Sequence, residues 1–332
     1  MTITAVRITP IAFRDPPLLN VVGIHERYAL RSIVEVETAD GLVGLGETYG
    51  DSAMIEGLQV VGDALIGLDP FDLAGLRRQV RGRLRPGGDE GLAIAPGTLR
   101  RNLPSKVEAA YEVAFLDLQG QLLGRPLVDL LGGPVRERVP FSAYLFYKLG
   151  RHRDAAPGDD DAWGEALDPE AIVAQARRMR REHGFASIKL KAGVLEPERE
   201  AATLLALADA FPGLPLRIDP NGGWTVETSV RMARELAAVL EYLEDPTPGL
   251  AGMAEVARQT ETPLATNMVI TAFEHLPEAL PVPSGPGLGV RLDRDALARQ
   301  HETYLRCGIC DRDDVAEMRR YRPGWTGALP RF

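Results

Sequence analysis

Residues 139 to 280 alternate between short apolar segments of β type and longer segments whose apolar residues recur every three or four positions. Alternating strand and helix signals of this kind predict a parallel sheet whose strands are joined by helical crossovers. Five strand–helix units share this stretch, roughly 28 residues each, which is close to the roughly 30 residues per unit of an eightfold barrel. The stretch therefore predicts an α/β domain of the (β/α) TIM-barrel type.

Each unit has predicted boundaries. Strands are expected at Val139–Tyr147, Ser187–Lys191, Pro215–Asp219, Leu240–Glu244 and Leu264–Asn267, and helices at Pro169–His183, Pro197–Ala210, Val226–Val239, Gly252–Thr260 and Ala272–Ala279.

The barrel is expected to be incomplete, with about five of the eight units. Three more units would need on the order of 85 residues by the same scaling. After Leu280 the chain instead passes into the Pro/Gly-rich stretch from Pro281 to Gly287, a helix at Asp295–Cys307 and an irregular tail. An open sheet exposes an edge and apolar surface, so we expect a second copy of the chain to cover it in a homo-oligomer.

The first 135 residues have a different pattern. Alternating β-type segments at 4–13, 29–38 and 42–49, the last two joined by a turn at Ala39–Gly41, precede helical segments at 52–66 and 105–123, with a surface loop at Arg81–Leu103. We expect an α+β capping domain at 1–135, a partial barrel at 136–284, and a carboxyl-terminal segment at 285–332 that returns to the capping domain.

Charge and hydropathy exclude several classes of partner. A net charge of -9 and a pI near 5.2 argue against nucleic acid, which needs a basic face. No apolar run approaches the length that spans a bilayer, and the amino terminus lacks a signal pattern, so we expect a cytoplasmic protein with a small-molecule substrate. Cys307 and Cys310 have no second cysteine pair and are expected to be incidental reduced thiols.

The predicted strand Ser187–Lys191 carries two lysines on one face. Successive side chains of a strand point to opposite sides, so Lys189 and Lys191 share a face and Ile188 and Leu190 share the other. If that face is solvated, the lysines are ordinary surface residues. If it is buried, repulsion and lost hydration lower their pKa values, and a lysine with a lowered pKa can act as a base.

Polar residues at the ends of the next three predicted strands favour the second reading. Asp219, Glu244 and Asn267 would converge with the lysines, because the carboxyl ends of all barrel strands open onto one face. Their oxygens are ligands that suit Mg²⁺, and a metal-bound carboxylate substrate loses its α proton more readily. Any one of them alone could be a helix N-cap or a loop carboxylate, but three in register make that reading weaker.

Four motifs in this order resemble the enolase superfamily, in its mandelate racemase and muconate lactonizing branch, and specifically the glucarate dehydratase group. They are Lys189–Lys191, DPNGGW at 219–224, LEDP at 243–246 and ATNM at 265–268; GPGLGV at 285–290, RDD at 312–314 and PGW at 323–325 extend the resemblance over nearly all of the chain.

The resemblance implies a role for each matching residue. Lys191 would be the acid/base, with Lys189 lowering its pKa, and Mg²⁺ would be held by Asp219, Glu244 and Asn267. The residues that would contact an acid sugar are Asn20, His25, Tyr144, Phe146, Asn221 and Arg312.

Two departures from the family pattern separate the functional hypotheses. The family's further metal-ligating Glu has no counterpart, since Ala251 stands at its place, and the strands that carry an Asp–His acid/base dyad are missing at Leu280–Pro281. None of His152, His183, His275 and His301 fits by motif. The first hypothesis is Mg²⁺-dependent dehydration of a glucarate-like acid sugar; the alternative is a relic that binds metal or sugar acid without catalysis. A racemase or epimerase is disfavoured because it needs both faces.

Overall fold

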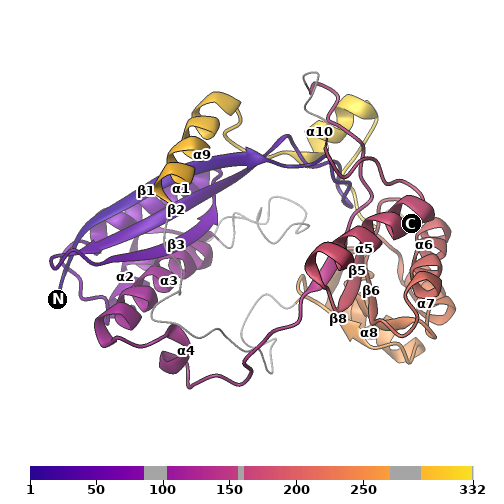
Figure 1. Ribbon diagram of the computed structural model, residues 1–332, viewed down its shortest axis with the longest axis horizontal. Helices are drawn as coiled ribbons and strands as arrows, with labels where there is room; N and C mark the ends of the chain where they lie inside the picture. The colour runs from indigo at the N-terminus through magenta and orange to yellow at the C-terminus, as the bar shows by residue number, and fades with distance from the viewer. Residues whose placement is uncertain (86–102, 156–160, 270–292, 331) are drawn as a thin grey trace.

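The computed structural model describes residues 1–85, 103–155, 161–269, 293–330 and 332. Two units, each with its own apolar core, lie side by side (Figure 1). One is an antiparallel sheet covered by helices, and the other is a parallel sheet covered by helices. The mixed α/β class and the capping unit are therefore confirmed.

The amino-terminal unit is a three-stranded antiparallel sheet of order β1-β2-β3. Its elements are β1 (Ile3–Arg14), β2 (Tyr28–Thr38), β3 (Val43–Tyr49), α1 (Ser52–Gly62), the short 3₁₀ helix η1 (Asp63–Leu65), α2 (Leu73–Arg83), α3 (Leu103–Leu123) and α4 (Leu127–Leu130). Helix α3 packs closely on β3 because Gly44 and Gly46 present bare backbone to it. The predicted strands, hairpin turn and first and third helices are correct, whereas α2 and α4 were not predicted.

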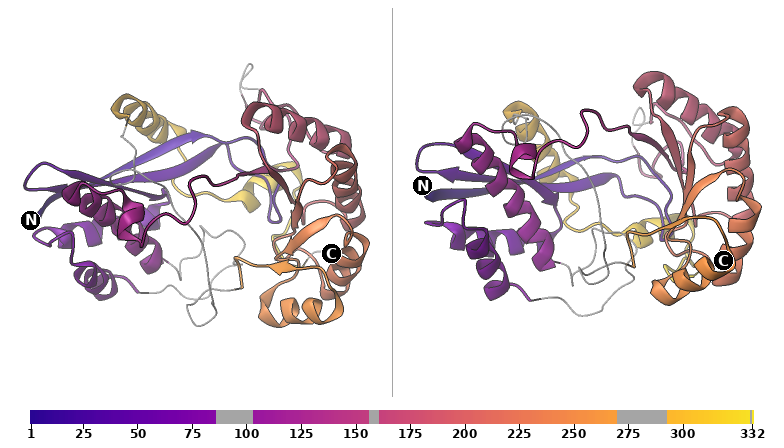
Figure 2. Two further views of the ribbon diagram at one scale, coloured as in Figure 1. Left: turned by 60° about the horizontal axis from the view of Figure 1, so that its bottom comes forward. Right: turned by 90° about the horizontal axis from the view of Figure 1, so that it is seen from below.

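The second unit is a five-stranded parallel sheet of order β4-β5-β6-β7-β8, with α5 to α8 on its outer side (Figure 2). Its strands are β4 (Ser142–Leu145), β5 (Ser187–Lys191), β6 (Leu216–Asp219), β7 (Leu240–Glu244) and β8 (Leu264–Ala265), and its helices are α5 (Pro169–His183), α6 (Pro197–Ala210), α7 (Val226–Glu235) and α8 (Gly249–Gln259). Each element was predicted within a few residues, because strand and helix periodicities alternate cleanly here.

The carboxyl-terminal segment joins the two units. Helix α9 (Arg294–Cys307) packs on β1, and α10 (Asp314–Tyr321) lies where the units meet (Figure 1). The prediction of an irregular tail is thus wrong for α10, whose N-cap Asp313 accepts a hydrogen bond from Ala316 N. The domain boundaries remain a prediction.

Several sequence predictions fall outside the described residues. They are the loop beyond residue 85, the helix Ala272–Ala279 with His275, the GPGLGV motif and the Leu280–Pro281 junction on which the missing strands depend. The described residues hold five parallel strands, and the completeness of the barrel stays a prediction.

The contact between β3 and α3 can be tested with one methyl group. A Cβ added at Gly46 would lie 2.2 Å from the backbone oxygen of Ala110. We therefore expect Gly46→Ala to lower the free energy of unfolding by about 1–3 kcal/mol, as overpacking does. Gly82→Ala is the matched control, since a Cβ at exposed Gly82 of α2 meets no atom within 4 Å and should be neutral or stabilising by up to about 1 kcal/mol. Equal urea midpoints for the two variants would contradict this packing.

Candidate functional site

Four charged side chains meet at the carboxyl ends of β5, β6 and β7. Parallel pairing sets Lys191 beside Asp219, and its Nζ donates to Asp219 Oδ2 at 2.8 Å. Lys189 Nζ lies 3.0 Å from the same oxygen and 2.6 Å from Glu244 Oε2. The lysine face of β5 is therefore engaged with carboxylates, and the reading of two freely solvated lysines is wrong.

Burial gives the two lysines different acidities. Burial lowers the pKa of Lys191, and the neighbouring Lys189 ammonium adds to this against the attraction of Asp219. Burial also acts on Lys189, but Asp219 and Glu244 together outweigh it and raise its pKa. Lys191 is thus the better base of the pair, and Lys189 the better permanent cation.

A third carboxylate, that of Asp245, completes an acidic cluster. Ligand oxygens of Asp219, Glu244 and Asp245 lie within 4.8 Å of one another, and all three residues are buried. Burial raises the pKa values of Glu244 and Asp245, and the Asp219 charge adds to each shift. Oxygen donors held this close suit a hard divalent cation. In this arrangement the ammonium of Lys189 contacts both Asp219 and Glu244 and supplies part of the compensating charge.

Sequence reasoning missed Asp245 although it directly follows Glu244 in the LEDP motif. Its backbone has a φ of 40°, which turns its carboxylate away from the strand direction toward the chain after β8. There it accepts hydrogen bonds from Thr266 Oγ1, at 2.5 Å, and from Asn267 N, at 3.0 Å. Asn267 is exposed, and it contacts Asp245 through its backbone N–H, so its role as a metal ligand stays a prediction.

A pocket of about 730 Å³ opens above Lys191. Its walls come from the capping unit, the parallel sheet and the carboxyl-terminal segment. The structure brings all six predicted substrate residues to it, namely Asn20, His25, Tyr144, Phe146, Asn221 and Arg312. Their roles in substrate binding stay predictions. The structure shows that these residues come from three distant parts of the chain and line one pocket.

Aromatic rings of β4 and the residues just after it link the lysines to the capping loop. The Tyr144 ring centroid lies 4.9 Å from Lys189 Nζ and 5.7 Å from Lys191 Nζ. The Tyr144 and Phe146 rings are 4.7 Å apart, and Phe146 meets the His25 ring edge-on at 5.8 Å. Burial, with Asp219 and Glu244 nearby, raises the pKa of Tyr144, so its hydroxyl stays protonated and can donate.

Aspartates hold the polar residues on the capping side. Asn20 Nδ2 donates to Asp314 Oδ2 at 2.7 Å, and Arg312 donates through two nitrogens to Asp314, at 2.7 and 3.1 Å. Asn221, at a φ of 49°, donates through its backbone to Asp219 Oδ1 at 3.1 Å. Asn20, Arg312 and Asn221 are thus each held by an aspartate carboxylate, and the bond from Asn20 to Asp314 joins parts of the chain 294 positions apart.

The loop after Lys191 is held by Glu200, a residue that sequence reasoning missed. The fully buried Glu200 carboxylate of α6 accepts the backbone N–H groups of Gly193, Val194 and Leu195 at 2.9–3.0 Å. Gly193 is required at its position, since a Cβ there would lie 2.3 Å from Pro220 O and its φ is +74°. Burial raises the pKa of Glu200 to about 7 against the opposing effect of these bonds.

Within the described part of the chain, no helix has the length and apolar character needed to cross a membrane.

Two family models and several known proteins match this chain. The model of the mandelate racemase / muconate lactonizing enzyme N-terminal domain matches residues 3–132, and that of an enolase C-terminal domain-like family matches residues 171–281. A probable glucarate dehydratase of Streptomyces coelicolor is 50% identical over 289 residues, which cover 84% of this chain and 66% of that protein. An L-talarate/galactarate dehydratase of Salmonella typhimurium is 27% identical over 79% of this chain and 59% of its own length.

Solved structures align with this chain over a larger share of their own length. An enolase of Pseudomonas fluorescens, crystallised with magnesium, potassium and tartrate, is 44% identical with a TM-score of 0.94, covering 100% of this chain and 99% of that one. The chain nevertheless spans about two thirds or less of the curated relatives, at 66% and 59% of their lengths.

The acidity of Glu200 predicts a pH dependence of stability. The folded pKa of Glu200, about 7, lies above the ordinary value of 4.5. The stabilisation from its protonated form is therefore fully present below pH 4.5 and is lost as pH rises through 7. Relative to Glu200→Gln, the wild-type chain should lose about 3 kcal/mol of unfolding free energy from low pH to pH 8. Urea unfolding of both proteins at pH 5, 6, 7 and 8 measures this difference, and a constant difference would show that Glu200 titrates normally.

Proposed function

Since the chain belongs to the mandelate racemase and muconate lactonizing branch of the enolase superfamily, we propose that it catalyses Mg²⁺-dependent dehydration of a glucarate-like acid sugar. One observation carries the proposal. Lys191, a lysine with a lowered pKa, lines a pocket and lies 2.8 Å from a buried carboxylate that belongs to an all-oxygen cluster. A base beside a metal-binding cluster is what removal of a proton α to a carboxylate requires.

The donor set of the cluster fits Mg²⁺. Asp219 and Glu244 would hold the ion, Asn267 is the predicted third ligand, and Asp245 is an additional candidate. When bound, Mg²⁺ would supply positive charge that stabilises the charge developing on the substrate carboxylate. The magnesium in the Pseudomonas fluorescens enolase supports this choice of metal.

The chain's own residues would perform the proton transfer. Lys191 Nζ would accept the α proton, while Lys189 keeps its positive charge and neutralises Asp219 and Glu244. The Tyr144 ring covers both ammonium groups and limits their contact with water. Burial of Lys191 lowers its pKa and so favours the neutral amine, against the attraction of Asp219 and of the ring for the charged form.

The pocket suits a small acid with several hydroxyl groups. Its volume of about 730 Å³ exceeds what a six-carbon acid needs, and hydrogen-bonding side chains such as Asn20, His25 and Arg312 line it. The two dehydratases are named for glucarate and for talarate and galactarate, which are sugar diacids. The tartrate in the Pseudomonas fluorescens structure is a shorter diacid of the same kind. A sugar diacid is thus the substrate class we propose.

The alternative of a binding relic has one observation in its favour. Of the four histidines that the structure describes, His25 is the one that lines the pocket, and it comes from the capping loop rather than from a barrel strand. The family's dyad, predicted from the sequence to be missing at Leu280–Pro281, would supply the second acid/base, and the chain spans 66% and 59% of the two dehydratases.

Turnover of glucarate distinguishes a dehydratase from a binding relic. Purified chain with Mg²⁺ and glucarate should form the dehydrated 2-keto acid, detected as its semicarbazone, and Lys191→Met should reduce kcat by at least about a thousandfold because the base is removed. Arg78→Gln, on the exposed face of α2, is the matched loss of a cation far from the site and should leave kcat unchanged.

Failure would take a definite form. If the wild-type chain forms no keto acid but binds glucarate in a Mg²⁺-dependent way by calorimetry, dehydration is ruled out and binding without catalysis is supported. Full activity of Lys191→Met would remove Lys191 from the mechanism.

A further inference from the structure

Asp15, directly after β1, connects two of the predicted substrate residues. A single carboxylate oxygen, Oδ2, lies 3.0 Å from His25 Nδ1 and accepts from Arg312 NH1 at 3.2 Å. All three residues line the large pocket. They come from the end of β1, the capping loop and the segment before α10, so one oxygen ties together parts of the chain almost 300 positions apart.

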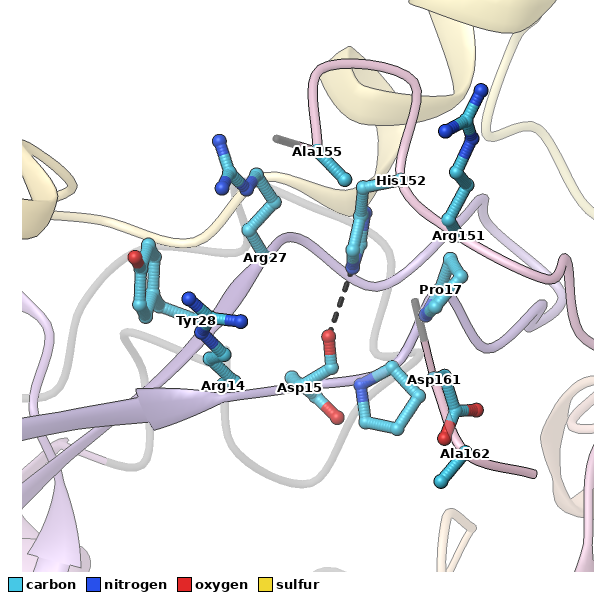
Figure 3. A pocket seen from close by; sticks show the side chains of 11 residues that line it. Arg14, Asp15, Pro17, Arg27, Tyr28, Arg151, His152, Ala155, Asp161 and Ala162 are labelled. Carbon is cyan, nitrogen blue, oxygen red and sulfur yellow. Dashed lines mark hydrogen bonds between the residues drawn. The ribbon is translucent and has the colours of Figure 1, made fainter. Parts of the chain in front are cut away.

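The backbone of Asp15 is fixed from the opposite side. His152 Nε2 lies 2.8 Å from Asp15 O, and the dashed line in Figure 3 marks this contact. On the same residue, Asp15 N donates to Arg27 O at 2.9 Å. His152 is buried and belongs to a second, smaller pocket of about 290 Å³ that shares Asp15 with the first. The loop after β4 therefore holds the backbone of Asp15, and the carboxylate of Asp15 is left to face the substrate pocket.

This arrangement determines which ring nitrogen of His25 carries the proton. An ionised carboxylate only accepts hydrogen bonds, and the same oxygen also accepts from the Arg312 guanidinium. Nδ1 of His25 must then be the donor. In the neutral ring Nε2 is left with a free lone pair, and within the described residues it has no hydrogen-bond partner.

We propose that Asp15 is a positioning residue for substrate recognition: it holds His25 as the Nδ1–H tautomer, so that Nε2 accepts a hydrogen bond from a substrate hydroxyl, and it orients Arg312. The assignment rests on the proposed function, because it takes the pocket to be the acid-sugar site. Nothing in the sequence singled out Asp15, which lies outside every motif that carries the family resemblance.

Asp314 holds Arg312 and Asn20 through hydrogen bonds to its carboxylate, as Asp15 holds His25. Arg312 is fixed through three nitrogens, one to Asp15 and two to Asp314, whereas the His25 ring has Asp15 as its one hydrogen-bond partner among the described residues. Loss of the Asp15 carboxylate should therefore free His25 far more than Arg312. The effect of an Asp15 variant is expected to act through His25.

The experiment compares Asp15→Asn, His25→Gln and the double variant with Asp168→Asn. Asp168 is the N-cap of α5, where Asn serves equally well, so this control makes the same chemical change away from the pocket. Each protein is assayed for the KM and kcat of glucarate and, without turnover, for glucarate affinity by calorimetry. ¹⁵N NMR of histidine-labelled protein identifies the His25 tautomer, with His25→Gln assigning its resonances.

We expect Asp15→Asn and His25→Gln each to raise KM and weaken affinity roughly tenfold to a hundredfold, with a smaller change in kcat. The double variant should be little worse than His25→Gln, since Asp15 acts mainly through His25 and Arg312 keeps its two hydrogen bonds to Asp314. The wild-type His25 should be the Nδ1–H tautomer and lose that preference in Asp15→Asn. Asp15→Glu, which keeps a carboxylate, should retain the tautomer even if Asp15→Asn does not fold.

Opposite results would overturn the inference. These are an Nε2–H tautomer in the wild-type protein, an unchanged affinity in Asp15→Asn, or losses that multiply in the double variant. Because the tautomer and the affinity are measured without turnover, absence of dehydration in the wild-type chain would count against the proposed function and leave this inference to be judged by its own two readouts.

Discussion

One carboxylate oxygen, Oδ2 of Asp219, accepts two ammonium groups, and the organisation of the site depends on this contact. Lys189 and Lys191 lie 3.0 and 2.8 Å from it, and Asp219 is buried at the end of β6. Two cations on one strand face repel each other, and the attraction of both to this carboxylate offsets the repulsion. With it, Lys189 becomes the cation of the acidic cluster, and Lys191 is left at the pocket wall as the group whose protonated form is less favoured.

The other half of the site is assembled from the ends of the chain. The capping loop between β1 and β2 and the segment before α10 face the sheet, and hydrogen bonds from Asn20 and Arg312 to Asp314 hold them together. The parallel sheet thus supplies the chemistry, and the capping unit with the carboxyl-terminal segment supplies the contacts that would select a substrate. Asp15 belongs to this second half, where its carboxylate fixes His25.

The parallel units were predictable because strand and helix periodicities alternate there, and polar residues at strand ends must share one face. Lys189, Lys191, Asp219 and Glu244 followed from that geometry. Asp245 could not, because its place in the cluster depends on a φ of 40°. Asp15 could not, because its partner Arg312 is 297 positions away, and Glu200 could not, because its partners are backbone N–H groups of a loop, which carry no side-chain signal. Helix α10 was missed because it is short and polar, with two buried residues, Glu317 and Met318.

Manganese binding tests most directly whether this cluster of carboxylates is a metal site next to a lysine base. Mn²⁺ takes the same oxygen ligands as Mg²⁺ and can be followed by electron paramagnetic resonance. We expect one ion per chain, which Mg²⁺ displaces. Asp219→Asn should bind it at least about tenfold more weakly, and Lys189→Met should bind it more tightly, since that change removes the competing ammonium. Failure of the wild-type chain to bind Mn²⁺, or equal affinity in Asp219→Asn, would contradict a metal site at this cluster.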